Sequence, residues 1–166
     1  MPTSDAFTYI SSLYFPNYVL NLLFKSSHLT QLLHLIFSGL GGFVFLRFLG
    51  LSRIVAFMGG TAFMITPFMI TMIVFGHGSQ MMTAAYIPWI MFLTTKVMQK
   101  PIMFNVGLLA ILIGLQLQRA HVQIAYYTWM LAGAFVLFTF ISTYKVPEKR
   151  NNSLYGLGGF AIAARL

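Results

Sequence analysis

Long apolar stretches separated by short polar connections are the feature that most limits how this chain can fold. The first runs from Leu29 to Leu49 and contains one charged side chain, Arg47. About 20 mostly apolar residues allow a helix to cross the hydrocarbon core of a bilayer. The 166 residues include only 10 Lys and Arg and 2 Asp and Glu, whereas about a quarter of the residues in soluble domains are charged. The sequence therefore predicts an all-α integral membrane protein.

Six such stretches predict a polytopic helical bundle with five complete transmembrane helices and an incomplete sixth. The predicted spans are residues 29–49, 54–75, 81–97, 101–117, 124–143 and 154–166. Residues 1–28 are predicted to form an extracytoplasmic loop segment, and residues 29–166 the transmembrane helical domain. The third stretch is short and carries Pro88 near its middle, whereas Pro101 suits the first turn of the fourth.

The basic residues divide unevenly between the connections. Seven fall on one side of the predicted bundle, namely Arg47, Arg53, Lys96, Lys100, Lys145, Lys149 and Arg150. Two fall on the other side, Lys25 and Arg119, and Arg165 lies within the incomplete sixth span. Because cytoplasmic loops are enriched in Lys and Arg, the seven are predicted to face the cytoplasm. The N-terminal segment and the connections at residues 76–80 and 118–123 are then extracytoplasmic.

The same composition excludes several other classes of protein. A net charge of +8 would fit nucleic-acid binding only if the basic residues formed a patch on a soluble face, and here they are scattered between apolar stretches. The absence of cysteine excludes disulfides and thiolate metal sites. Four scattered histidines form no metal motif, and His28 and His34 are interpreted as a helix cap and as a hydrogen-bonding residue between helices. No metal site is predicted, and the cofactor is left open, with a divalent metal as one possibility.

Small residues occur on the first two predicted helices. Gly39, Gly41 and Gly42 lie on the first, and Gly59 and Gly60 lie on the second. Small residues let membrane helices approach closely, so these glycines are interpreted as packing positions without a chemical role.

Polar side chains gather in "QRAHVQIAYY", residues 118–127. Arg119 and His121 lie where the fourth span ends and the fifth begins, and Gln123 and Tyr127 share one face of the fifth helix. Free backbone N–H groups at a helix N-terminus, together with Arg and His, would suit a phosphate at headgroup depth. Alternatively, Arg119 extends to lipid headgroups, as long cationic side chains often do, and His121 caps the helix. Both interpretations stay open.

The other outer connection, "GHGSQ" at residues 76–80, has a similar character. The glycines on either side of His77 permit unusual backbone angles and suit a tight turn back into the membrane. His77 and Gln80 then offer hydrogen-bond donors and acceptors on the outer face. Alternatively, this is a polar turn followed by Tyr86 and Trp89 as aromatic residues at the membrane interface, and for the aromatic pair this second interpretation is favoured.

Carboxylates are too few for common acid–base chemistry. The chain has only Asp5 and Glu148, and the charge rule places Glu148 in the cytoplasm. A pair of carboxylates of the glycosidase type therefore cannot be assembled on the outer face. Either Asp5 is the catalytic residue, or the catalytic acid is not in this chain.

At these motifs the chain resembles a known family. "GHGSQMMTAAYIPWI", followed by "LQLQRAHVQIAYYTW", is similar to motifs of the YfhO-like bacterial multipass membrane proteins. "LLHLIFSGLGGFVFLRFLGLSRIVAFMGGTAFM" is similar to the pair of spans that precedes those motifs in the family. The resemblance covers most of the chain and keeps the order of the motifs.

The YfhO-like family is placed with the GT-C type membrane glycosyltransferases. The resemblance implies that the chain lies in the bacterial cytoplasmic membrane and transfers a sugar from a polyprenyl-phosphate carrier to an extracytoplasmic acceptor. It also implies that the family's catalytic aspartate, in the first outer loop, stands upstream of Met1, so the chain is expected to be a fragment that is inactive alone. The family's histidine-proline is His121-Val122 here.

Three functions are therefore weighed. The first is a segment of a lipid-linked-sugar glycosyltransferase whose outer face binds the carrier through Arg119, His121, Gln123, His77 and Gln80. The second is a segment of a transporter or flippase for a lipid-linked or small polar substrate, in which the same groups line a translocation path. Transporters more often carry polar residues at mid-span or at broken helices, and these cluster at the outer ends. The third is a structural membrane subunit without a site.

Overall fold

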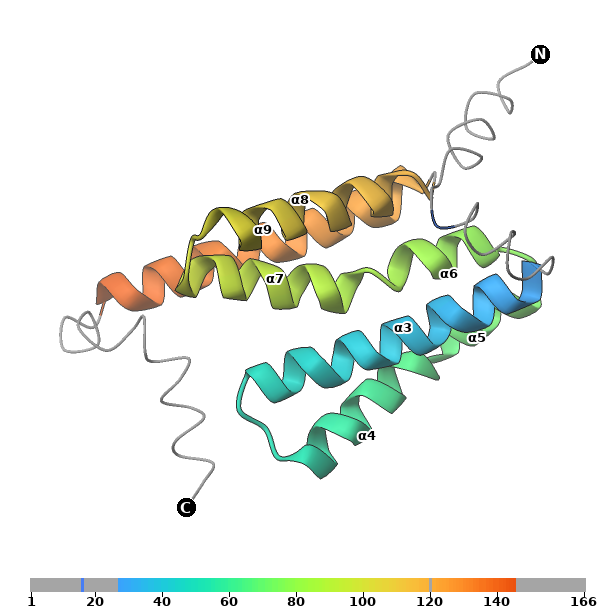
Figure 1. The fold of residues 1–166 in the computed structure, drawn as a ribbon. Coiled ribbons are helices and arrows are strands. Elements are labelled where there is room, and N and C mark those ends of the chain that lie inside the picture. The colour runs from blue at the N-terminus through green and yellow to red at the C-terminus, as the bar shows by residue number, and fades with distance from the viewer. Residues whose placement is uncertain (1–15, 17–26, 120, 146–166) are drawn as a thin grey trace, which may run out of the picture.

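The computed structural model describes Pro16, residues 27–119 and residues 121–145. Every regular element in these residues is helical, which confirms the predicted all-α fold (Figure 1). The helices are α3 (Ser27–Phe48), α4 (Arg53–Met64), α5 (Pro67–Val74), α6 (Gly78–Ala84), α7 (Ile87–Gln99), α8 (Met103–Leu117) and α9 (Val122–Lys145). Asp5, Glu148 and the predicted sixth span lie outside the described residues.

Three segments are long and apolar enough to cross a membrane, namely His28–Phe48, Arg53–Val74 and Val122–Ser142. They correspond to the first, second and fifth predicted spans. The fourth predicted span is α8, whose 15 residues extend about 22 Å at 1.5 Å per residue, less than the roughly 30 Å of a hydrocarbon core. The third is divided into α6 and α7. Only three of the five predicted complete spans thus meet the length and apolarity of a membrane-crossing helix.

Apart from the α4–α5 and α6–α7 breaks, the connections between the helices lie at two opposite ends of the bundle (Figure 1). One end holds the α3–α4 and α7–α8 connections and the last turn of α9. The other holds the start of α3 and the α5–α6 and α8–α9 connections. Residues 76–80 and residues 118, 119 and 121 therefore lie at one end. The helix ends that carry Arg47, Arg53 and Lys96, and the connection at Lys100, lie at the other, so the structure groups these connections as the sequence predicted.

Prolines divide the second and third predicted spans. Pro67 has no N–H to donate to the Phe63 carbonyl, so the helix breaks between α4 and α5. The Thr66 hydroxyl donates to the Phe63 carbonyl instead, at 3.1 Å. Pro88 lies in the first turn of α7, and its ring conflicts with a helical carbonyl at Ala84, where α6 ends. The sequence pattern predicted one continuous span across Pro67, and the structure corrects this.

The bundle exposes large apolar side chains and buries polar side chains beside its apolar core. Large apolar side chains are exposed along α4 and α9, among them Ile54, Phe57, Leu137 and Phe138. Polar side chains are buried between the helices, among them Ser38, Thr83, Thr95, Asn105, Gln116 and Thr128. Apolar surface of this extent requires an apolar solvent, and polar groups in a membrane face the interior of the bundle. Both observations fit a bilayer.

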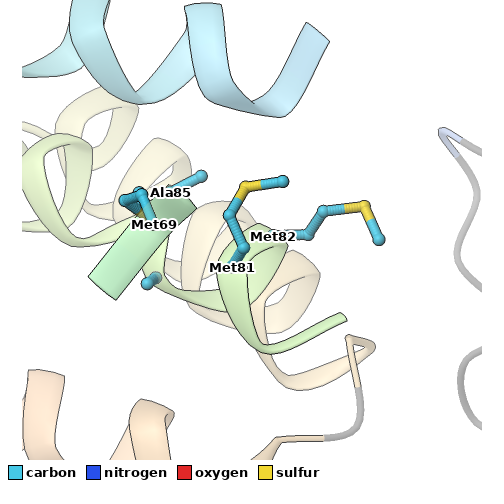
Figure 2. Packing of buried hydrophobic residues seen from close by; sticks show 5 residues of the cluster. Met69, Met81, Met82 and Ala85 are labelled. Carbon is cyan, nitrogen blue, oxygen red and sulfur yellow. The ribbon is translucent and has the colours of Figure 1, made fainter. Parts of the chain in front are cut away.

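Helices α6 and α7 form the centre of the bundle. Figure 2 shows Met69 of α5 beside Met81, Met82 and Ala85, which come from α6 and its C-terminal end. Methionine is flexible and fills irregular gaps, which suits a site where two broken helices meet. The α6–α7 segment is therefore enclosed by protein, and this explains how it tolerates a break that would be costly in contact with lipid.

The glycines of α3 and α4 meet at close range. A Cβ atom added at Gly60 would lie 2.5 Å from the Gly39 carbonyl oxygen and 2.8 Å from the Phe43 backbone nitrogen. A Cβ added at Gly42 would lie 3.0 Å from the Gly60 Cα atom. The interpretation of these glycines as packing positions is therefore confirmed.

Tyr86 and Trp89 lie inside the bundle, so the favoured interpretation as interface aromatics was wrong. Tyr86 is buried, and the Trp89 indole donates to the Phe37 carbonyl at 2.9 Å and stacks on the Phe37 ring. These aromatics join α7 to α3 next to the break. His34 packs edge-on to Tyr86, so its side chain does lie between helices, but its 2.8 Å hydrogen bond goes to the Thr30 carbonyl within α3.

Candidate functional site

Ser79 and His121 join the two connections that the sequence analysis singled out. The Ser79 hydroxyl and the His121 Nε2 atom lie 2.8 Å apart across 42 residues of sequence. The backbone carbonyl of His121 accepts the first hydrogen bonds of α9, from Ile124 and Ala125, both at 3.2 Å. His121 thus occupies the capping position by its backbone, while its imidazole points to Ser79 rather than to the helix end.

The environment of His121 favours its neutral form. Burial lowers the pKa of His121 below 6.5, and electrostatic repulsion from His77 and then from Arg119 lowers it further. Nε2 of a neutral ring can accept the Ser79 proton, and Nε2 of an imidazolium can donate to the Ser79 oxygen. The contact with Ser79 therefore fixes the ring in either charge state.

Arg119 lies inside the protein rather than at its surface. The side chain is 3% exposed, and one terminal guanidinium nitrogen lies 2.9 Å from the Met82 sulfur. The alternative in which Arg119 extends to lipid headgroups does not fit this burial. The backbone N–H of Arg119 bonds the Gln116 carbonyl at 3.2 Å, and this last turn of α8 directs the side chain inward.

Gln116 is a buried polar residue that the sequence analysis missed. It is 0% exposed. Its amide nitrogen donates to the Thr83 carbonyl at 3.2 Å and to the Thr128 hydroxyl at 3.0 Å. Gln116 thereby joins α6, α8 and α9 and satisfies a carbonyl in the last turn of α6, next to the break at Pro88. A glutamine within a long apolar stretch was the available signal, because such a residue is costly unless it faces a partner.

A cavity of about 530 Å³ lies between α4–α5 and α9, within the range of roughly 300–1,000 Å³ typical of small-molecule sites. We call it the lateral groove. The α4–α5 side is lined by Phe63, Thr66, Phe68 and Met69, and the α6–α7 side by Gln80, Ala84 and Ile87. The α9 side is lined by His121, Gln123, Ile124, Tyr127, Thr128 and Leu131.

The lateral groove is polar at one end and largely apolar along its length. His121, Gln123 and Gln80 lie at the end where the α5–α6 and α8–α9 connections meet, and Gln123 donates to the Tyr127 hydroxyl at 3.1 Å. Leu131 lies ten residues after His121, which corresponds to about 15 Å along the helix axis at 1.5 Å per residue. Phe68, Tyr127 and Leu131 are exposed, so the groove opens sideways toward the apolar surroundings of the bundle.

The predicted site residues are therefore only partly gathered. His121, Gln123 and Gln80 line one cavity, and Arg119 lies behind it against α6. His77 is exposed at the start of α6, where its side chain makes no capping bond. Gly76 has a positive φ of 77°, as the tight turn predicted before α6 requires. Asp5 lies outside the described residues, which contain no group of three or more His, Cys, Asp or Glu placed to hold a metal ion.

Comparisons with protein-family models, with curated proteins and with solved structures find no match to this chain. The arrangement of its own helices and side chains is therefore the basis for assigning a function. Within the described residues that arrangement is a helical bundle with three helices able to cross a membrane and an amphipathic groove that opens sideways.

Proposed function

We propose that this chain is the carrier-binding segment of a membrane glycosyltransferase that moves a sugar from a polyprenyl-phosphate carrier to an extracytoplasmic acceptor. The observation that supports the proposal most is the lateral groove. A polyprenyl phosphate has a long apolar chain and a small anionic head, and the groove has an apolar length and a polar end beside Arg119 and His121. Its sideways opening allows a lipid to enter from the bilayer.

The proposal assigns binding to this chain, not the acid–base step. Residues 27–119 and 121–145 contain no Asp or Glu. His121 and Gln123 can position a phosphate or a sugar hydroxyl through hydrogen bonds, and the cation of Arg119 behind them stabilises negative charge at that end of the groove. The catalytic carboxylate is Asp5 or belongs to sequence outside this chain, as the resemblance to the YfhO-like proteins implies.

A photoreactive carrier tests the proposal. A polyprenyl phosphate with a diazirine near the end of its chain, added to liposomes that hold the 166-residue protein, should label α9 at residues 124–131 and α5 at residues 67–69. Excess unlabelled polyprenyl phosphate should suppress this labelling, as mass spectrometry of the cleaved protein would measure. Labelling that is spread over lipid-facing Ile54, Phe57 and Phe138, without competition, would count against a carrier site.

The proposed topology places the groove's polar end outside the bacterial cytoplasmic membrane, with five spans crossing it and residues 1–28 outside. The seven-to-two division of basic residues supports this orientation. Because the chain has no cysteine, single cysteines report cleanly. His77→Cys should react with an impermeant thiol reagent added outside cells, and Lys100→Cys should react only after the membrane is opened. The opposite pattern would invert the topology.

A transporter or flippase is the second candidate, because two broken helices border the groove. Thr66 lies at the α4–α5 break and Ala84 at the α6–α7 break, and broken helices often form substrate sites in transporters. However, the Phe63 carbonyl at the first break is already bonded by the Thr66 hydroxyl, and the Thr83 carbonyl at the second is bonded by Gln116. Movement of a fluorescent lipid-linked sugar across liposomes that contain the protein would favour this candidate.

A further inference from the structure

His121 stands at the polar end of the lateral groove in a fixed orientation. Its imidazole lines the groove, and Ser79 bonds its Nε2 atom at 2.8 Å from the neighbouring helix. Gln80 and Gln123 line the same end of the groove. A headgroup in the groove would therefore lie next to a ring that can gain a proton without losing its bond to Ser79.

The charged and titratable groups around His121 come from three segments. His77 precedes α6, Arg119 lies in the turn after α8, and Tyr127 follows on α9. The lining residues of α4–α5 and α7 (Phe63, Thr66, Phe68, Met69 and Ile87) carry no titratable group. Within the described residues, the His121 ring thus has His77 and Arg119 near it and no carboxylate. An anionic ligand in the groove would offset the electrostatic repulsion that these two groups exert on a protonated ring.

This inference rests on the proposed function. We propose that the lateral groove selects lipids with an anionic headgroup, and that His121 takes up one proton from the solvent when such a lipid binds. The lipid's chain lies along α9 toward Leu131, and its headgroup lies beside His121, Gln80 and Gln123. No bond to the lipid forms or breaks; a water-borne proton moves to the imidazole, and the imidazolium and the anion then stabilise each other.

The direction of the pH dependence follows from the charges. In the free groove, burial and repulsion from His77 and Arg119 hold the pKa of His121 below 6.5. A bound anion raises that pKa, because an opposite charge at close range favours the protonated ring. Affinity therefore increases as the pH falls through the bound-state pKa and levels off below the free-state pKa. Between the two values the dissociation constant changes by up to about tenfold per pH unit, which is one proton per lipid.

The probe for this linkage must keep its own charge constant. Geranylgeranyl methyl phosphate is a phosphodiester and stays a monoanion between pH 5 and 8, whereas geranylgeraniol has the same chain without charge. The full chain would be placed in nanodiscs of phosphatidylcholine, and the dissociation constant of each probe measured at pH 8, 7, 6 and 5. The phosphodiester should bind three- to tenfold more tightly at pH 5 than at pH 8, and the alcohol should show no change.

Two variants assign the effect to His121. His121→Gln should lose most of the pH dependence of phosphodiester binding, because the amide does not titrate. His28→Gln is the matched control, since His28 is exposed on α3 and does not line the groove, and it should keep the wild-type dependence. If His121→Gln does not fold, calorimetry of wild-type binding in buffers of different ionisation enthalpy still counts the protons taken up.

The outcomes separate this inference from the proposed function. Binding of the phosphodiester with the same affinity at every pH, or with no proton uptake, overturns the role of His121 and leaves the carrier site standing. Equal binding of the phosphodiester and the alcohol overturns the selection for an anionic headgroup. Failure of both probes to bind at any pH overturns the carrier site itself, and the linkage with it.

Discussion

Gly60→Val is expected to lower the free energy of unfolding by about 3 kcal/mol, near the upper end of the range for overpacked cores. The Cβ atom of valine would lie 2.5 Å from the Gly39 carbonyl oxygen and 2.8 Å from the Phe43 backbone nitrogen. Both are backbone atoms, which cannot move aside by changing a rotamer, so α4 must separate from α3. This contact should be among the most sensitive in the protein, because close helix packing in membranes depends on small residues.

The measurement is thermal unfolding of the detergent-solubilised chain, followed by circular dichroism. A loss of about 3 kcal/mol corresponds to a fall in Tm of roughly 6–12 °C for a chain of this size. Gly133→Val is the matched control, because a Cβ at Gly133 on α9 meets nothing within 4 Å, and its Tm should change by less than half as much. Equal shifts in the two variants would mean that the α3–α4 contact is not as close as described.

The sequence predicted the helical fold well because apolar stretches in a membrane leave the backbone few alternatives. Each of the five complete apolar stretches coincides with a helix or a pair of helices. The connections between these stretches lie at the two ends of the bundle to which the sequence assigned them. The break at Thr66 was missed although Pro67 was visible. Hydropathy is averaged over a window of residues, so one missing backbone N–H does not change it. The same missing N–H is enough to break a helix.

The candidate site was predictable only in outline. The segments around His77 and His121 stood out in the sequence because polar residues in an apolar chain are costly. The two segments are joined by the hydrogen bond between the Ser79 hydroxyl and His121, which are 42 residues apart in the sequence. Periodicity within one helix cannot reveal a contact of this kind. Arg119 was expected near the surface because it lies in a connection, but a single turn after α8 directs it against Met82.

Leu131→Trp is expected to weaken binding of a polyprenyl phosphate by tenfold or more, which is about 1.4 kcal/mol or more of binding free energy. Leu131 lines the lateral groove and is 51% exposed, so an indole there would fill part of the apolar length without entering the core of the bundle. Leu137→Trp is the matched control. Leu137 lies on the same helix, is 59% exposed and does not line the groove.

Comparison of these two variants tests the central claim most directly, namely that the groove between α4–α5 and α9 is a carrier site. The affinity of a short-chain polyprenyl phosphate for the wild-type chain and for each variant would be measured in phosphatidylcholine nanodiscs, after circular dichroism has established that both variants keep the wild-type helix content. The account predicts saturable binding to the wild-type chain and to Leu137→Trp, and a dissociation constant at least ten times higher for Leu131→Trp. Equal affinity in all three proteins would contradict the assignment of the carrier to this groove.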